Sequence, residues 1–325
     1  MRKAAVFVTR DIGEKALARL RPVVDLEVWP GDYPPPRSVI LEKVPGLFGL
    51  LTLLTDPIDA EVINSAGPEL KVISQMAVGV DNIDVKAATA RGIPVGNTPG
   101  VLTETTADMA WALLMAVARR VVEADQQVRQ GIWKPWGPDV LTGPDIHGST
   151  IGIIGFGRIG QAVARRARGF NMKILYFDPQ RQIDLEESLG VEYAPLNDLL
   201  SQSDFISLHT FLNASTRHMI SKQQFECMKP SAILINTSRG GVVDPAALTW
   251  ALQEKKIAGA GLDVYDPEPI QKDNPILGMS NVVITPHIAS ASIETRRKMA
   301  LMAVENVLAA VLGKKLPYCV NPEVY

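Results

Sequence analysis

The sequence has few residues of the kinds that mark secreted, metal-binding or membrane proteins. It contains 2 cysteines among 325 residues, and Cys227 and Cys319 lie far apart without companion ligands, so neither a disulfide framework nor a metal site is expected. The longest apolar run, residues 109–118, ends in Arg119 and Arg120 and is too short to span a bilayer. The apolar run near the start is also too short for the core of a signal peptide, and a cytoplasmic protein is therefore expected.

Charge of one sign is not in excess either. Lys and Arg number 33 and Asp and Glu number 35, which gives a formal net charge of −2. Nucleic acids and anionic membranes attract proteins with a strong positive excess, so neither is expected as a partner. Hydrophobic residues at 46% and charged residues at 21% are ordinary for a packed soluble protein, and 325 residues favour two domains.

Short apolar runs alternate with helical patterns in two series. The first series, within residues 1–100, includes the runs AAVFVT, GLFGLLTLL, KVISQMA and IPVGNTP, with helical patterns at 13–20 and 59–66. The second begins at Thr150 and has six candidate strands, which are TIGIIG, MKILYFD, DFISLH, AILINTS, GAGLDV and VVITPH. Such alternation predicts parallel sheets with helical crossovers.

Two long helices are predicted outside these series. One covers roughly Thr103 to Gln130 and ends near Gly131, and the other is an amphipathic helix from Ser292 to Leu312. The last helix follows the second series, so it is free to return to the first domain. The predicted fold is therefore α/β with two Rossmann-like domains, a discontinuous substrate-binding domain at 1–100 and 288–325 and an NAD(P)-binding domain at 101–287.

A glycine motif opens the second series. Gly155, Gly157 and Gly160 follow an apolar strand and begin a helical segment, in the pattern Gly-x-Gly-x-x-Gly. The first glycine permits a tight turn, the second lets the backbone approach a pyrophosphate, and the third lets the helix pack closely on the strand. The amides and dipole of the helix N-terminus then face the phosphates. This context predicts a dinucleotide cofactor.

An acidic residue follows at the position that reads the adenosine ribose. Asp178 ends the MKILYFD run, and a carboxylate there accepts hydrogen bonds from the ribose hydroxyls and repels a 2′-phosphate. NAD is therefore favoured. Arg158 and Arg181 lie close enough in sequence to meet a 2′-phosphate, so NADP stays possible.

Three residues near strand ends have the chemistry that reduction of a 2-oxo acid needs. Arg239 ends one strand and offers a planar fork that matches a carboxylate, although it is also consistent with a surface arginine before a turn. His287 follows another strand and Pro286, where it is either an acid/base or a packed core histidine. Glu268 lies in a proline-rich loop, and as a partner of His287 it would keep the ring protonated for donation. Of the other histidines, His209 is expected at the adenosine side of the cofactor.

The motifs GFGRIG, INTSRGGVVD, GLDVYDPEP and TPHIAS, in this order, resemble those of the D-isomer-specific 2-hydroxyacid dehydrogenases. The resemblance covers essentially the whole chain. It implies two Rossmann-like domains with the active site between them, and a homodimer built on the nucleotide-binding domains. It also implies that Arg239 binds the substrate, that His287 is the acid/base and that Glu268 is its partner.

The resemblance and the glycine motif together assign further positions. The cofactor-binding residues are expected to be Thr106, Gly155, Gly157, Arg158, Ile159, Gly160, Asp178, His209, Thr237, Ser238, Asp263, His287 and Ala289. The substrate-binding residues are expected to be Leu53, Val78, Gly79, Arg239, His287 and Ser290.

Within the family, the chain resembles the glyoxylate/hydroxypyruvate reductases, which implies reduction of a small 2-oxo acid to the D-2-hydroxy acid by direct hydride transfer. Trp136 is either a packing residue or a residue that walls the substrate pocket of a partner subunit. Phe211 departs from the family pattern, because a proline is expected there, and this alters the expected packing of the adenine. Three alternatives stay open, which are another D-2-hydroxyacid substrate, phosphite oxidation, and an NAD-sensing co-regulator that binds other proteins.

Overall fold

The computed structural model describes residues 3–325; residues 1 and 2, with which the predicted first domain begins, lie outside this range. The chain forms two compact units. Unit 1 comprises the described part of Met1–Leu102 together with Ala291–Tyr325, and unit 2 comprises Thr103–Ser290. Each unit contains a sheet in which the strand pairs are parallel, so the predicted α/β class with parallel sheets is confirmed.

Unit 1 is built on a five-stranded sheet in the order β2-β1-β3-β4-β5, as far as the described residues show. Its strands are β1 (Ala4–Val8), β2 (Val24–Val28), β3 (Gly49–Thr52), β4 (Val72–Gln75) and β5 (Val95–Gly96). Its helices are α1 (Glu14–Leu20), α2 (Arg37–Lys43), α3 (Ala60–Ser65), α4 (Val85–Ala90) and α12 (Ile293–Val311), followed by the short η3 (Pro322–Val324). β3 and β4 are buried along their whole length, as expected for central parallel strands covered on both faces.

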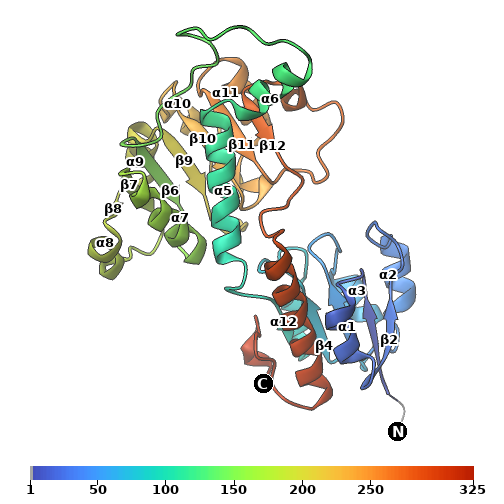
Figure 1. Ribbon diagram of the computed structural model, residues 1–325. Helices are drawn as coiled ribbons and strands as arrows, with labels where there is room; N and C mark the ends of the chain where they lie inside the picture. The colour runs from blue at the N-terminus through green and yellow to red at the C-terminus, as the bar shows by residue number, and fades with distance from the viewer. Residues whose placement is uncertain (1–2) are drawn as a thin grey trace. The chain divides into compact units, whose positions relative to one another are not determined.

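The last helix belongs to unit 1, as the amphipathic pattern at its position allowed. α12 lies beside α1 and against β4 (Figure 1). The Ser292 side chain caps its N-terminus by accepting from the amide of Thr295, and the Ser74 hydroxyl of β4 donates to the carbonyl of Ala303 at 2.8 Å. On the other face of the sheet, α2, α3 and α4 pack on Phe7, Leu50 and Ile73.

Unit 2 is built on a seven-stranded sheet in the order β12-β11-β10-β9-β6-β7-β8, counted over the described residues. Its strands are β6 (Thr150–Ile154), β7 (Lys173–Phe177), β8 (Glu192–Tyr193), β9 (Phe205–Leu208), β10 (Ile233–Asn236), β11 (Gly259–Leu262) and β12 (Val282–Ile284). Its helices are α5 (Thr103–Ala118), α6 (Val121–Arg129), α7 (Arg158–Gly169), α8 (Ile183–Leu189), α9 (Leu196–Gln202), α10 (Lys222–Cys227) and α11 (Pro245–Gln253), with η1 (Gly240–Val242) and η2 (Pro275–Gly278).

The helices of unit 2 cover both faces of its sheet. α5 and α7 cover one face (Figure 1), where they pack on apolar side chains of β6, β9 and β10. α9, α10 and α11 pack on the opposite face, against β9, β10 and β11. The strand order reverses its direction at β6, since β7 and β9 lie on either side of it. In open α/β sheets such a switch point opens a crevice at the carboxyl ends of the strands.

The prediction of a single helix over residues 103–130 is wrong, because the chain breaks it at Arg119 and Arg120. α5 ends at Ala118, and Arg120 has a left-handed φ of +50° before α6 begins. The Arg120 guanidinium bonds Glu123 and the carbonyl of Thr142, and Gly143 lies directly against the carbonyl of Ala118. These tertiary contacts fix the break, and hydrophobic periodicity carries no information about them.

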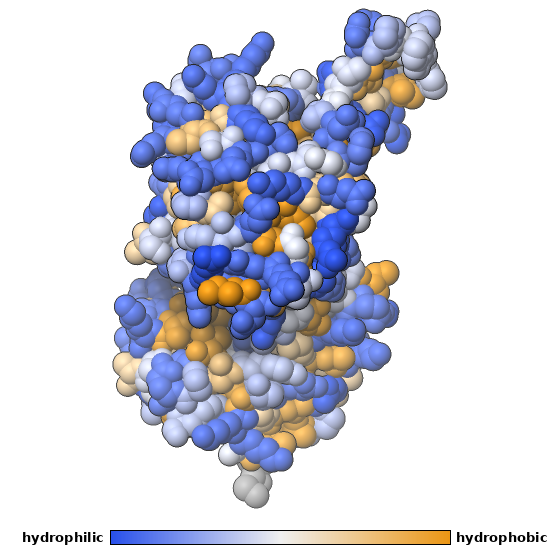
Figure 2. All heavy atoms as spheres, turned by 90° about the vertical axis from the view of Figure 1, so that its left-hand side faces the viewer, coloured by the Kyte–Doolittle hydropathy of each residue, from blue (hydrophilic) through white to orange (hydrophobic). Residues whose placement is uncertain are grey.

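The surface is largely polar. Figure 2 shows hydrophilic side chains over much of the face in view, with smaller hydrophobic groups between them. Among the residues that the structure describes, no helix is long and apolar enough to cross a membrane.

Candidate active site

The glycine motif forms the turn between β6 and α7, at the switch point of the sheet. Gly155 has a φ of +90°, and a Cβ there would come within 2.6 Å of the His209 carbonyl. A Cβ on Gly160 would come within 2.2 Å of the Gly155 carbonyl oxygen, whereas one on Gly157 would meet nothing within 4 Å. Two of the glycines are therefore required by close packing, and the third leaves the loop open on its outer side.

The surroundings of this turn fit a dinucleotide. The N-cap residue of α7, Gly157, supplies no side-chain cap, and the first turn of the helix carries no acidic residue. The amides of Arg158 and Ile159 and the helix dipole are thus available to a pyrophosphate. Thr210 and Thr237, at the carboxyl ends of β9 and β10, have buried hydroxyls without a hydrogen-bond partner among residues 3–325. Unpaired buried hydroxyls are costly, and a bound ligand would satisfy them.

Asp178 stands where the sequence places the reader of the adenosine ribose. It directly follows β7, and its carboxylate accepts from the amide of Phe156 at 2.8 Å and from that of Gln180 at 3.0 Å. The first of these bonds ties the carboxylate to the glycine turn. Arg158 is exposed at the start of α7, while Arg181 is paired with Glu186 at 2.7 Å.

His209 ends the strand that lies beside the glycine turn. Its Nε2 is 2.7 Å from the Ser207 hydroxyl, and burial lowers the pKa of the ring to about 3. The imidazole is therefore neutral at physiological pH and does not act as a cation for the phosphates. Phe211, two residues further, is 75% exposed.

The pair Glu268 and His287 is formed. His287 Nδ1 lies 2.8 Å from Glu268 Oε2, and the other oxygen of Glu268 accepts from the amide of Tyr265 at 2.8 Å. The two side chains are 29% and 23% exposed, so solvent or a ligand reaches them. The contact fixes Nδ1 toward the carboxylate and leaves Nε2 to face a reacting group.

A buried carboxylate holds the backbone around His287. Asp263 is fully buried, and its oxygens accept from the hydroxyl of Thr285 at 2.5 Å and from the amides of Ile288 at 2.9 Å and Ala289 at 2.7 Å. Its backbone carbonyl accepts from the amide of His287 at 2.9 Å. Asp263 therefore determines where the histidine stands, in addition to the cofactor contact that the resemblance implies.

Arg239 lies on the turn that follows β10. The Asn236 side chain shapes this turn, because its amide donates to the Arg239 carbonyl at 2.9 Å and its oxygen accepts from the Ser238 amide and hydroxyl. Gly240 lies so close to the Tyr265 carbonyl that a Cβ there would come within 1.9 Å of it. The arginine turn thus packs against the loop that carries Glu268.

Sequence reasoning missed several of these supporting residues. Asn236, Tyr265 and Thr285 hold the turns of Arg239, Glu268 and His287, yet none was singled out. The signal available for Asn236 was a polar residue closing an otherwise apolar strand, which is buried and fully bonded here. Tyr265 gave no signal, since its hydroxyl contacts Leu262 and Thr285 only after folding.

Three of the predicted substrate residues lie in unit 1, at the carboxyl ends of β3 and β4. A buried network surrounds them. The Asp56 carboxylate accepts from the Leu53 amide at 2.7 Å, and the Asn82 side chain donates to the Leu53 carbonyl at 3.2 Å. Gln75 donates to the Gly79 carbonyl at 3.3 Å and Asn97 donates to that of Val78 at 2.8 Å. The backbone at all three positions is therefore fixed within unit 1.

The structure thus brings together the glycine turn, Asp178 and His209 in one part of unit 2, and Arg239, Asp263, Glu268 and His287 in another. Ala289 and Ser290 follow the histidine on the same segment, and Thr237 and Ser238 precede the arginine. Thr106 is buried in the first turns of α5. No group of His, Cys, Asp and Glu in the described range could hold a metal ion.

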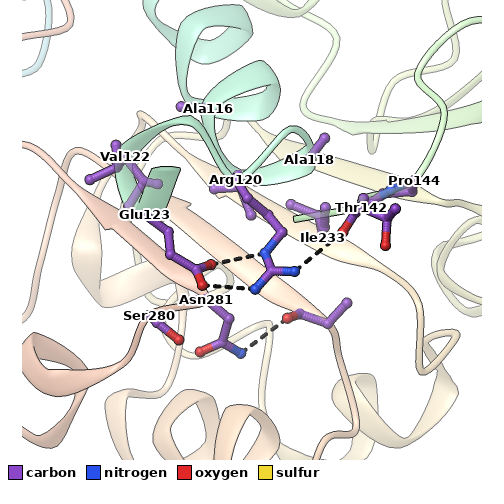
Figure 3. A pocket seen from close by; sticks show the side chains of 14 residues that line it. Ala116, Ala118, Arg120, Val122, Glu123, Thr142, Pro144, Ile233, Ser280 and Asn281 are labelled. Carbon is purple, nitrogen blue, oxygen red and sulfur yellow. Dashed lines mark hydrogen bonds and ion pairs between the residues drawn. The ribbon is translucent and has the colours of Figure 1, made fainter. Parts of the chain in front are cut away.

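A pocket of about 270 Å³ lies elsewhere in unit 2 (Figure 3). Ile233, Ala258 and Asn281 line it, so it stands at the amino ends of β10, β11 and β12, away from the strand ends described above. The Arg120 side chain points into it and bonds Glu123 at 2.8 Å.

Comparison with known proteins assigns the chain to a family. Residues 111–289 match the family model described as the NAD binding domain of D-isomer specific 2-hydroxyacid dehydrogenases. A glyoxylate reductase of Korarchaeum cryptofilum is 57% identical over 99% of this chain and 97% of its own length. The chain belongs to the D-isomer specific 2-hydroxyacid dehydrogenases. It is therefore an NAD(P)-dependent dehydrogenase, and its reaction is the NAD(P)-dependent reduction of a 2-oxo acid.

Solved structures agree with this assignment. A protein from Thermus thermophilus is 46% identical and superposes with a TM-score of 0.91, over 97% of this chain and 99% of that one. An NADPH-dependent glyoxylate/hydroxypyruvate reductase from Sinorhizobium meliloti, solved with NADP and malonate, is 32% identical with a TM-score of 0.87, over 99% of this chain and 98% of that one. The dehydrogenase thus has both NAD and NADP among the cofactors of its relatives.

Proposed function

We propose that this dehydrogenase reduces glyoxylate or hydroxypyruvate to the D-2-hydroxy acid, with His287 as the acid/base. The observation that carries the proposal is the 2.8 Å contact between His287 Nδ1 and Glu268. An ionised carboxylate on Nδ1 stabilises the imidazolium, which then carries a proton on Nε2. The names of the relatives support the choice of substrate.

In the proposed reaction the nicotinamide, when bound, supplies the hydride. His287 donates the Nε2 proton to the carbonyl oxygen of the substrate as negative charge develops there. Arg239 holds the substrate carboxylate through its planar fork, together with the backbone of Val78 and Gly79 and the neighbouring Leu53 and Ser290. Glu268 keeps the ring oriented throughout and itself transfers no proton.

For the cofactor we propose a preference for NAD over NADP. Asp178 is held by two backbone amides at 2.8 and 3.0 Å, so its carboxylate is fixed where ribose hydroxyls bind and a 2′-phosphate is repelled. The remaining predicted contacts would come from the glycine turn, Thr106, His209, Thr237, Ser238, Asp263 and Ala289.

We further propose a homodimer. The large exposed hydrophobic residues of α6 and the segment after it suit a subunit interface, with Trp136 the most exposed of them at 90%. In such a dimer Trp136 would wall the substrate pocket of the partner. The cytoplasmic location stays a prediction from the sequence.

The test of the acid/base role is His287→Ala, compared with Glu268→Gln and with His147→Ala as an exposed control histidine. We expect His287→Ala to lower kcat by about 10²–10⁴-fold, the usual contribution of a positioned proton donor, while the Kd for NADH stays unchanged. Glu268→Gln should lower kcat less and shift its pH profile. Turnover retained in His287→Ala would remove the histidine from this role.

The test of the substrate is a comparison of initial rates with glyoxylate, hydroxypyruvate, pyruvate and a bulky 2-oxo acid, each with NADH and NADPH. The alternatives have distinct outcomes. A phosphite dehydrogenase would reduce NAD⁺ in the presence of phosphite, and a co-regulator would bind NADH without oxidising it with any 2-oxo acid.

A further inference from the structure

The segment between β7 and α8 carries a cation that competes with the reading of Asp178. Arg181 lies in this segment, three residues after Asp178. In dinucleotide-binding folds an arginine near this strand end accommodates a 2′-phosphate, whereas an acid alone selects the ribose hydroxyl. Sequence reasoning therefore leaves the preference open, because both residue types are present.

Arg181 is already engaged within the protein. Its Nε lies 2.7 Å and its Nη2 lies 2.8 Å from the two oxygens of Glu186, which is the paired geometry of a strong arginine–carboxylate contact. Its guanidinium also stands 5.4 Å from the centre of the Tyr193 ring. The arginine would have to leave both partners to reach a phosphate.

Glu186 is itself held in place. The hydroxyl of Tyr176, a residue of β7 whose ring is fully buried, donates to Glu186 Oε1 at 2.8 Å and accepts from the amide of Gln182 at 2.9 Å. The hydrogen bonds from Arg181 and Tyr176 lower the pKa of Glu186 to about 2, so it is charged over the whole physiological range. The acceptor of Arg181 is thus anchored to the sheet.

We propose that Glu186 sets the cofactor preference of this chain by holding Arg181 away from the 2′ position of the adenosine ribose. The inference rests on the proposed preference for NAD and extends it to a residue that touches neither cofactor. Asp178 repels a 2′-phosphate directly, and Glu186 removes the nearby cation that would compensate for this repulsion. Glu186 is a specificity-determining residue that acts through Arg181.

The experiment measures the Kd of NADH and NADPH by nucleotide fluorescence, in the absence of any 2-oxo acid. We expect Glu186→Ala to tighten NADPH binding about fivefold, the scale of one exposed ion pair, and to change NADH binding by less than about twofold. The matched control is Glu187→Ala, which removes the same charge from the next residue of α8, where the side chain is exposed. It should leave the ratio of the two constants unchanged.

Two arginine variants decide whether Arg181 is the released cation. Arg181→Ala alone should leave NADPH binding nearly unchanged, since the arginine is engaged elsewhere, and Arg181→Ala combined with Glu186→Ala should abolish the gain. Arg158→Ala combined with Glu186→Ala should keep the gain. A gain that survives the loss of Arg181, or that Glu187→Ala reproduces, would overturn the proposal.

Glu186→Gln serves if the alanine variant fails to fold, because it keeps an acceptor for Tyr176 and removes the charge. Binding of 2′-phospho-ADP-ribose, which has no nicotinamide, should follow NADPH in every variant. These readouts need no turnover. Failure of the proposed reaction would appear as intact nucleotide binding without NADH oxidation, whereas failure of this inference would appear as an unchanged ratio of NADH to NADPH affinity.

Discussion

The backbone at His287 adopts a conformation that only its surroundings explain. Its φ of +53° lies in the left-handed region, which residues other than glycine seldom occupy. The Asp263 carbonyl accepts the His287 amide, and the Asp263 carboxylate holds the next two amides. Such positions persist where the surrounding structure fixes them, and they cluster at functional sites. Because these bonds involve no atom of the imidazole, we expect substitutions at 287 to leave the turn in place.

His209 provides a prediction of pH dependence at the residue scale. Burial lowers the pKa of its ring from 6.5 to about 3, so the unfolded chain takes up a proton below pH 6.5 and the folded chain does not. Stability is therefore lost as the pH falls from 6.5 toward 3. This loss should reach about 1.4 kcal/mol at pH 5.5, one unit below the ordinary value.

The measurement is urea unfolding of the wild type, His209→Gln and the exposed control His147→Gln at pH 7.5, 6.5 and 5.5. Glutamine does not titrate and offers a hydrogen-bonding group to Ser207, so its unfolding free energy should fall less between pH 7.5 and 5.5. The control should follow the wild type. Equal losses in His209→Gln and the wild type would show that the histidine is protonated in the folded state.

At the scale of elements, the junction of β6 and α7 determines the cofactor site. α7 approaches the strand so closely that the Cα of Gly160 stands against the Gly155 carbonyl. Gly169, at the other end of the same helix, has nothing within 4 Å of a Cβ position. The two glycines therefore differ in purpose, since one permits contact and the other does not.

Gly160→Ala should separate helix and strand, lower the free energy of unfolding by about 1–3 kcal/mol, as overpacking does, and weaken NADH binding at least tenfold. Gly169→Ala is the matched control and should be neutral or stabilising by up to about 1 kcal/mol, because alanine is the better helix former. Thermal unfolding and NADH titration measure both effects. If Gly160→Ala bound NADH as the wild type does, the close approach would not be needed for the site.

The strands, the glycine turn and the pair of Glu268 and His287 were within reach of the sequence, because local apolar runs, glycine spacing and motif order identify them. The end of α5 was not, since the contacts of Arg120 and Gly143 that fix it come from residues distant in sequence. The role of Glu186 was likewise hidden. Its bond to Tyr176 joins a helix to a strand, and neither residue alone predicts it.

At the scale of the whole molecule, exposed hydrophobic side chains gather in one part of unit 2. Val121, Val128 and Ile132 are 53%, 51% and 50% exposed, and Trp133 and Trp136 are 75% and 90% exposed. Aromatic residues are enriched in protein interfaces, and a patch of this kind is costly to leave in water. With a net charge of only −2, little electrostatic repulsion opposes association. These properties support the proposed homodimer.

The combined change Val128→Glu and Ile132→Glu should convert the dimer to a monomer, because each glutamate would have to lose its hydration at the interface. Sedimentation velocity at micromolar concentration measures this. Tyr33→Glu, at an 83% exposed residue of unit 1, is the control and should leave the dimer intact. If Trp136 walls the partner's pocket, Trp136→Ala should raise the KM for hydroxypyruvate without dissociating the dimer, and the monomeric variant should show the same increase. A wild type that sediments as a monomer would exclude both expectations, since a residue 90% exposed in an isolated chain would then have no subunit to contact.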